Sequence, residues 1–409
     1  MSLTKKRWIV LFASCIINLC IGSLYAWSVF SSPMAAHLSL LSTNKTADLS
    51  IIFTVANAVG PITMISGGFI NDKLGPKWAI FFGGLLFGFG MIASGFAESV
   101  EMILITYGLG VGLGVGLVYG CTVSNSVKLF PDKRGFVGGI TTASYGISSV
   151  IIPPVANLLI SELGITAAFK ILGIAMLIII CTAAFCIVPC PKDFLPDGWN
   201  PPIGARAAFT EKNWRAMLKD PVFYIMLIIL CCGAFSGLMI VSQASPLAQR
   251  TVGMNTAAAA TVVSVLALFN TCGRIASGFV YDKIGAIKTI RIVFIISLAG
   301  LCALYFCNKS IFIFCLGICL VGLAFGSVMG IYPGFTASQF GTKNNSVNYG
   351  IMFCGFAVAG YFGPSIMSDL YLKSGSYSIA FIVAAVLSAS GFLLTFLFQK
   401  IWYRQKAHF

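Results

Sequence analysis

The sequence predicts an all-α membrane protein with twelve transmembrane helices in two six-helix pseudo-repeats. Three observations predict this fold class: the composition, the number of long apolar stretches and an internal repeat. Of the 409 residues, 58% are hydrophobic and only 9% are charged, and the mean hydropathy is +0.94. A soluble globular domain carries about 25% Asp, Glu, Lys and Arg. The composition therefore excludes an ordinary soluble protein and requires lipid as the solvent for most of the chain.

Twelve stretches of the chain are long and apolar enough to cross a bilayer, which takes roughly 20 residues in a helix. They are residues 8–30, 50–70, 79–97, 103–127, 136–160, 166–189, 221–242, 256–280, 290–307, 311–339, 349–371 and 379–402. A polar, proline-containing stretch separates the sixth from the seventh. We therefore predict an N-terminal six-helix bundle over residues 1–190, a cytoplasmic linker over 191–219 and a C-terminal six-helix bundle over 220–409.

The positive charges predict the orientation. With the N-terminus inside, 20 of the 26 Lys and Arg fall on the cytoplasmic side. The outer side holds five: Lys45, Lys170, Arg250, Lys309 and Lys373. Because cytoplasmic loops of membrane proteins are enriched in Lys and Arg, this bias predicts that both termini lie in the cytoplasm. We expect the chain to lie in the inner cell membrane. The bias also accounts for the net charge of +14 without a nucleic-acid partner.

An internal repeat relates the two halves at an offset of 210 residues. Gly68-Phe69-Ile70-Asn71-Asp72-Lys73-Leu74-Gly75 matches Gly278-Phe279-Val280-Tyr281-Asp282-Lys283-Ile284-Gly285. The same offset pairs Gly116 with Gly326, Gly120 with Gly330, and Lys133 with Lys343. Two parallel repeats of six spans are typical of transporters that bind their substrate near the midplane and move one bundle against the other.

The repeated loops carry a family resemblance. The G-x-x-x-D-K-x-G-x-K pattern from Gly68 to Lys77 resembles the signature loop of the major facilitator superfamily, and residues 278–288 resemble its second copy. Further residues resemble the oxalate/formate antiporter family, which is related to the monocarboxylate transporters: Gly22, Tyr25, Trp27, Tyr119-Gly120, Leu129-Phe130-Pro131-Asp132-Lys133-Arg134-Gly135 and Tyr145-Gly146. The resemblance covers essentially the whole chain.

The signature loops predict a conformational gate. Asp72 and Asp282 fall at cytoplasmic helix ends, beside Lys73 and Lys283. Charges in these places can hold the two halves together in one conformation and release them in another. A static cap of a helix end is the alternative role for them.

Arg274 is the only charged residue that falls deep within a predicted span. It precedes Asp282 by eight residues, which places it roughly 12 Å from the cytoplasmic edge of the bilayer. An ionisable residue inside a membrane is a functional-site hypothesis by default, and none of the 12 acidic residues falls mid-span to neutralise this one. We expect Arg274 to bind an anion; the alternative is an arginine that joins helices through backbone carbonyls.

The resemblance narrows the anion. Arg274 matches an arginine that the oxalate/formate family carries on helix 8, whereas the lysine that its oxalate transporter carries on helix 11 is replaced here by Phe356. A single guanidinium neutralises a single carboxylate, and a second carboxylate would be left uncompensated in a medium of low dielectric constant. A monocarboxylate is therefore the predicted ligand. The other predicted site residues are Tyr25, Tyr119, Asn270 and Tyr332.

The sequence therefore predicts a secondary active transporter of small monocarboxylates of the lactate, pyruvate or formate type, working by alternating access. Proton symport and anion exchange both remain open. The alternatives are an oxalate/formate antiporter, an anion sensor that does not transport, and a multidrug exporter. No metal-ligand cluster, nucleotide motif or nucleophile with a base is present, so we expect neither an enzyme nor a cofactor. We expect the partners to be the anion, a proton in the symport case and membrane lipid, and the chain to act as a monomer.

Overall fold

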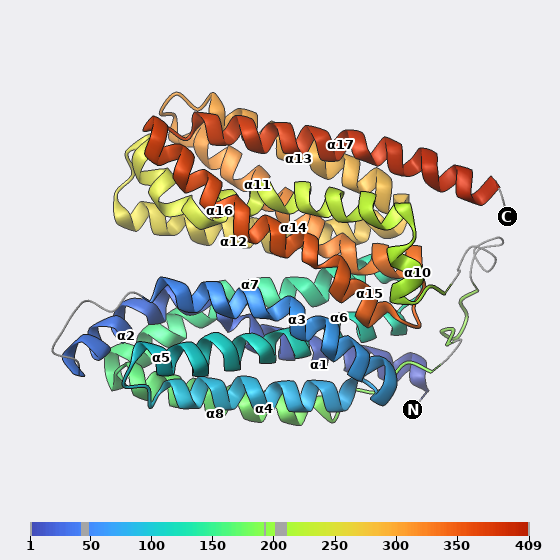
Figure 1. Cartoon of the computed structure of the whole chain (residues 1–409), viewed down its shortest axis with the longest axis horizontal. Coiled ribbons are helices and arrows are strands. Elements are labelled where there is room, and N and C mark those ends of the chain that lie inside the picture. Colours follow the sequence, from blue (N-terminus) through green and yellow to red (C-terminus); the bar gives the residue numbers. More distant parts are fainter. Residues whose placement is uncertain (1, 42–48, 192–193, 201–210, 408–409) are drawn as a thin grey trace. The chain divides into compact units, whose positions relative to one another are not determined.

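The computed structural model describes residues 2–41, 49–191, 194–200 and 211–407 (Figure 1). All regular secondary structure in these ranges is helical, and twelve helical segments are long and apolar enough to span a membrane. The predicted fold class is thereby confirmed. Lys45 and residues 192–193 and 201–210 of the predicted linker lie outside the described residues. The predicted division at residues 190 and 220 stays a prediction.

The contacts between residues group the chain into two units. Unit 1 comprises Met1–Asp132, Ser144–Asn200 and Thr342–Ile351. Unit 2 comprises Lys133–Ala143, Pro201–Gly341 and Met352–Phe409. Each unit therefore includes one short segment from the other half of the sequence. These two segments, Lys133–Ala143 and Thr342–Ile351, largely overlap when the first is shifted by the 210-residue offset of the repeat. The two halves of the repeat therefore contribute equivalent segments to each other's contact unit.

Unit 1 is built from helices that pack along their lengths. Its elements are α1 (Leu3–Ile21), the 3₁₀ segment η1 (Gly22–Ala26), α2 (Trp27–Leu41), α3 (Ser50–Leu74), α4 (Pro76–Ser94), α5 (Val100–Ile103), the π-helical segment η2 (Leu104–Val111), α6 (Gly112–Leu129), most of α7 (Arg134–Leu163), α8 (Ile165–Ala184) and α15 (Asn345–Met352). Helix α4 packs on α6 and α8, and α3 packs on α6 (Figure 1). Glycines at the helix contacts let these backbones approach closely, as in other membrane helix bundles.

Unit 2 is also built from helices that pack along their lengths. Its elements are the start of α7, α10 (Trp214–Leu218), α11 (Pro221–Val252), α12 (Thr256–Ile284), α13 (Ala286–Tyr305), α14 (Ile311–Phe340), α16 (Cys354–Ser374) and α17 (Ser378–Ala407). Helix α14 packs on α12 and α13, and α11 packs on α16 and α17. A chain of buried hydroxyls, Ser236 to Ser297 at 3.3 Å and Ser297 to Ser388 at 3.2 Å, joins α11, α13 and α17. Such hydrogen bonds add to packing where helices gain little from the hydrophobic effect.

Three of the spans contain irregularities that the sequence did not predict. The first span runs from Leu3 to Leu41, beyond the predicted 8–30, and η1 interrupts it. A Cβ atom at Gly22, in η1, would collide with the carbonyl oxygen of Tyr145. The glycine therefore allows this segment to lie directly against α7. The fourth span contains the π-helical η2, and the eleventh is broken at Phe353, between α15 and α16.

Candidate functional site

Arg274 is buried on α12 and hydrogen-bonded by its own helix and by α7. Its Nε donates to the side-chain oxygen of Asn270 at 3.0 Å, and Nη1 donates to the backbone carbonyl of Thr142 at 2.8 Å. The side chain is only 3% exposed. Asn270 lies one helical turn before Arg274, so the structure brings these two predicted site residues together. The alternative role predicted for Arg274 is to join helices through backbone carbonyls. The hydrogen bond to Thr142 is such a contact, and it uses one of the N–H groups of the guanidinium.

Glycines position the backbone of Arg274 between two other helices. A Cβ on Gly139 of α7 or on Gly330 of α14 would meet the carbonyl oxygen of Arg274, and one on Gly326 would meet that of Asn270. Helices α7 and α14 therefore both lie in close contact with this part of α12. The close packing fixes the backbone position of Arg274, and the hydrogen bonds to Asn270 and Thr142 fix the direction of its guanidinium group.

The guanidinium group keeps unused hydrogen-bonding capacity. Arginine has five N–H donors, and two of those of Arg274 have partners among the residues that the structure describes. The Nη2 group and one N–H of Nη1 have none there, and no carboxylate in those ranges pairs with the charge. A buried charge without a counter-charge is costly. The arrangement is suited to an anion that accepts two hydrogen bonds from one guanidinium edge.

Two other predicted site residues of unit 2, Phe356 and Tyr332, lie against aromatic rings or already make a hydrogen bond within the protein. The phenyl ring of Phe356 stacks on Phe353 with centroids 4.6 Å apart, and lies nearly parallel to Phe325 at 6.5 Å. Tyr332 is 1% exposed, and its hydroxyl donates to the backbone carbonyl of Met226 at 2.8 Å. The hydroxyl of Tyr332 is therefore engaged with α11, and a ligand would have to compete with this bond.

The predicted tyrosines of unit 1 form a cluster with a third tyrosine. The ring centroid of Tyr145 lies 5.2 Å from that of Tyr25 and 5.0 Å from that of Tyr119. Tyr25 is in the 3₁₀ segment η1, Tyr119 in α6 and Tyr145 in α7. Tyr145 is not among the predicted site residues, although the Tyr145-Gly146 pair carries part of the sequence resemblance.

In the first signature loop, Asp72 is paired with a lysine of another helix. Lys128 Nζ, on α6, lies 2.8 Å from Asp72 Oδ1 and also donates to the backbone carbonyl of Lys343 at 3.4 Å. The side chain of Lys73 is exposed and makes no hydrogen bond or ion pair within the described ranges. Asp72, which the sequence predicts to be a gating residue, is therefore paired with Lys128 rather than with its sequence neighbour Lys73.

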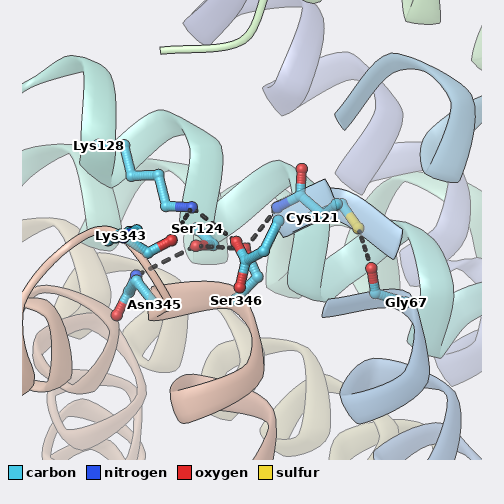
Figure 2. Close-up of polar contacts among 9 residues, drawn as sticks. Gly67, Cys121, Ser124, Lys128, Lys343, Asn345 and Ser346 are labelled. Carbon is cyan, nitrogen blue, oxygen red and sulfur yellow. Dashed lines mark hydrogen bonds and ion pairs between the residues drawn. The ribbon is translucent and has the colours of Figure 1, made fainter. Parts of the chain in front are cut away.

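Buried amide and hydroxyl groups surround this ion pair in unit 1 (Figure 2). Asn71, adjacent to Asp72, donates to the hydroxyl of Ser346, which donates to Ser124 at 2.9 Å. Asn345 donates to Ser124 at 3.2 Å. The start of α15 is thus attached to α3 and α6 by polar bonds, and Figure 2 shows Ser124 between Lys128 and Ser346.

The second signature loop caps a helix. Asp282 Oδ1 accepts from the backbone N–H of Gly135 at 2.7 Å, and Oδ2 accepts from that of Phe136 at 2.8 Å. Both oxygens therefore bind the first turn of α7, where a negative charge also interacts favourably with the helix dipole. The side chain of Lys283 is exposed and makes no hydrogen bond or ion pair with any residue that the structure describes.

The fold and these buried charges define an integral membrane protein with twelve helical spans. A family model for the Major Facilitator Superfamily matches residues 7–364. The chain belongs to this superfamily, and it is a transporter, not an enzyme. The sequence repeat and the signature loops had indicated the same family, so that prediction is confirmed.

The chain is similar to several named proteins. It is 29% identical over 407 residues to the oxalate:formate antiporter of Oxalobacter formigenes, with 98% of this chain and 93% of that protein covered. It is 27% identical over 345 residues to monocarboxylate transporter 12 of Rattus norvegicus, with coverage of 78% and 70%. The solved structure of the proton:xylose symporter XylE shares its fold, with a TM-score of 0.75 at 13% identity and coverage of 97% and 96%.

Proposed function

We propose that the chain is a secondary active transporter of small monocarboxylate anions of the lactate, pyruvate or formate type. The observation that carries the proposal is the buried guanidinium of Arg274, which retains three N–H donors and has no carboxylate partner in the described part of the chain. A carboxylate that enters this environment compensates the charge and accepts the free hydrogen bonds. The names of the relatives, an oxalate:formate antiporter and a monocarboxylate transporter, agree with a small organic anion.

The charge available supports a monoanion. Three charged side chains are buried among the described residues: Arg7, Asp220 and Arg274. Arg7 forms an ion pair with Asp132, and Asp220 forms one with Lys212. Arg274 is therefore the one buried cation in those ranges that is left for a ligand. The stacked phenyl ring of Phe356 offers no charge for a second carboxylate.

We assign the following roles within the proposed transporter. Arg274 binds the carboxylate, Asn270 orients the guanidinium, and Tyr25 and Tyr119 are hydroxyl donors to the substrate. The proposed moving bodies are residues 1–190 and 220–409, joined by 191–219, with Asp72 and Asp282 as the gating carboxylates. For Lys73 and Lys283 the gating role remains a prediction from the sequence. The role of Tyr332 in substrate binding likewise remains a prediction from the sequence. We place the chain in the inner membrane as a monomer with both termini in the cytoplasm.

Exchange of oxalate for formate is the second candidate function, and the similarity to the Oxalobacter antiporter favours it. In that case Arg274 would bind one carboxylate of oxalate, and the second would need a partner that Phe356 cannot provide. An anion exchanger moves its substrate only when a second anion is present on the other side of the membrane. A proton symporter needs no internal anion, since an imposed pH gradient drives uptake.

The proposal is tested with the purified chain in liposomes, loaded with or without an internal anion. Uptake of labelled lactate, pyruvate, formate and oxalate is measured for the parent and for Arg274→Gln. We expect the variant to lose nearly all transport of every anion that the parent carries, because the glutamine amide has no charge. Uptake driven by a pH gradient into empty liposomes indicates symport, and uptake that requires an internal anion indicates exchange.

The matched control is Arg215→Gln on α10, which removes one positive charge from an exposed position. It should transport as the parent does. An Arg274→Gln protein that is monodisperse and transports all four anions at the parent's rate would refute the anion-binding role of Arg274.

A further inference from the structure

A second group of cations lines a cavity that belongs wholly to unit 2. The cavity has a volume of about 270 Å³ and lies where α11 ends, α13 turns into α14 and α16 turns into α17. Its polar lining includes Arg250, Asn308, Lys309, Tyr371, Ser376 and Tyr377. The lining contains two positive charges and no Asp or Glu. The local potential of such a concave, one-signed surface is positive and attracts anions.

Arg250 is held in a defined orientation in this cavity. Its guanidinium carbon lies 4.4 Å from the ring centroid of Tyr371, and its Nη1 donates to the hydroxyl oxygen of Tyr377 at 3.4 Å. The two tyrosine rings stack at 4.4 Å. The flat side of the guanidinium is therefore covered by an aromatic face, as favours a cation–π contact. No carboxylate in the described ranges pairs with Arg250, so its remaining N–H groups are left for another acceptor.

The second cation sits in an unusual turn. Asn308 and Lys309 have φ values of 45° and 66°, and the N–H of Ser310 donates to the carbonyl of Cys307 at 2.7 Å. Two consecutive residues with positive φ form a turn of type I′, which glycine and asparagine prefer and lysine does not. A non-glycine residue in this conformation is worth attention as a functional constraint. The turn places Lys309 on the cavity wall beside the tyrosine pair.

The hydroxyl of Tyr377 completes the donor set. Burial raises the pKa of Tyr377, although the hydrogen bond and charge of Arg250 oppose the shift. The phenol therefore keeps its proton near neutral pH. Because its oxygen accepts from Arg250, its own O–H can donate, and no acceptor for it is present in the described residues.

We propose that this cavity is an accessory binding site for a small organic carboxylate, distinct from the Arg274 site. Arg250 and Lys309 bind the carboxylate, Tyr377 donates to it, and the faces of the stacked tyrosines contact its apolar part. The choice of carboxylate rests on the proposed function, since this is the class of anion that the chain is proposed to carry. The two sites share no residue, and Arg274 lies 18 residues into α12 from Thr256, roughly 27 Å along the helix axis.

The predicted topology places this cavity at the outer end of unit 2. Arg250 and Lys309 are two of the five cations that the charge distribution assigns to the outer side. An anion site there raises the local concentration of substrate at the face from which it enters. Loss of the site should therefore raise the KM for uptake at low salt and leave the maximal rate unchanged, because the Arg274 site is intact.

The experiment measures anion binding to the full-length purified chain by isothermal titration calorimetry at low ionic strength, with pyruvate, formate and inorganic phosphate as probes. All variants carry Arg274→Gln, which removes the first site. Arg274→Gln alone should still bind pyruvate. Adding Arg250→Gln and Lys309→Asn should weaken this binding at least about tenfold, as expected when charged partners in a cavity are removed. Asparagine suits the positive φ at position 309, so the turn is kept.

The matched control adds Arg215→Gln and Lys219→Gln, which remove two exposed charges at a different place in the chain, and should bind as Arg274→Gln does. The single change Lys309→Asn, in an exposed turn, tests the site in a protein that keeps the tyrosine pair intact, and should weaken binding about threefold. Absence of pyruvate binding to Arg274→Gln would overturn the accessory site, as would equal binding of inorganic phosphate and pyruvate.

The two proposals fail separately in this design. If the parent transports and Arg274→Gln binds no anion, the transport function stands and the accessory site is refuted. If the parent transports none of the anions and pyruvate still binds in a manner that depends on Arg250, the accessory site stands and the proposed function is refuted.

Discussion

The Nε group of Arg274 donates a 3.0 Å hydrogen bond to the amide oxygen of Asn270, one turn earlier on α12. A neutral amide at this position orients the guanidinium and leaves its charge available. A carboxylate in the same place would orient the group equally well but would neutralise it. In the proposed transporter, the identity of residue 270 therefore determines whether the ligand or the protein supplies the negative charge.

The first prediction follows from this relationship. Asn270→Asp should raise the KM for a monocarboxylate about tenfold or more at pH 7, because the new carboxylate competes for Arg274. The KM should stay raised down to pH 5, because the positive charge of Arg274 keeps an adjacent aspartate ionised in this range. Initial uptake rates in liposomes between pH 7.5 and 5 provide the measurement. Asn270→Leu is the control: it removes the amide without adding a charge, so its KM should rise less than that of Asn270→Asp.

The second prediction concerns Phe356. Phe356→Lys should shift the preference of the transporter towards a dicarboxylate such as oxalate, because a second cation in unit 2 compensates a second carboxylate. The ratio of oxalate to formate uptake should rise about tenfold over the parent. Phe356→Leu removes the same stacked ring without adding charge and should leave the ratio near that of the parent. A lysine variant that transports with an unchanged ratio would contradict the charge argument.

The third prediction concerns the cap of α7. Asp282→Ala removes the carboxylate whose two oxygens accept from the N–H groups of Gly135 and Phe136. The loss of an N-terminal cap of this kind costs about 0.5–2 kcal/mol. The melting temperature in detergent should therefore fall by a few degrees. Lys283→Gln, at the adjacent exposed position, should leave it unchanged, and an equal fall in both variants would argue against the capping role.

The fourth prediction is a pH dependence of stability at Asp220. Burial raises the pKa of this carboxyl, but hydrogen bonds from Lys212, Gln405 and the N–H of Val222, with the charge of Lys212, outweigh burial and lower it below its ordinary value. A carboxyl whose folded-state pKa is lowered stabilises the fold above its unfolded-state pKa of about 3.9. This contribution is lost as the pH falls from there through the folded-state value.

Thermal unfolding between pH 6 and 3 measures this effect. Below about pH 4, the melting temperature of the parent should fall more steeply with decreasing pH than that of Asp220→Asn. The amide of this variant does not titrate in this range. Asp197→Asn, at an exposed position, is the control and should follow the parent. Parallel curves for the parent and Asp220→Asn would show that this carboxyl is not the group responsible.

The sequence was sufficient to predict the features that depend on long patterns. Each of the twelve spans is a long apolar run, and the repeat at 210 residues is visible in the signature loops. Burial of Arg274 followed from its distance to Asp282 along a helix. These predictions need only the rise of a helix and the thickness of a bilayer.

Other features depend on which helices become neighbours, and residue patterns do not encode this directly. Thr142 contributes only its backbone carbonyl to Arg274, and any residue type has that group. Lys128 pairs with Asp72 across two helices, although Lys73 is adjacent in the sequence. Arg250 and Lys309 were visible only as outer charges, because three separate chain segments close their cavity.

The exchange of Lys133–Ala143 and Thr342–Ile351 between the two contact units has a consequence for dissecting the molecule. No single cut of the polypeptide yields a fragment that contains all the packing partners of its own helices. An N-terminal fragment ending before Thr342 would lack Ser346, leaving the buried amide of Asn71 and the hydroxyl of Ser124 without that partner in an apolar environment. The separated halves should therefore be poorly soluble alone and should recover when they are produced together in the same membrane.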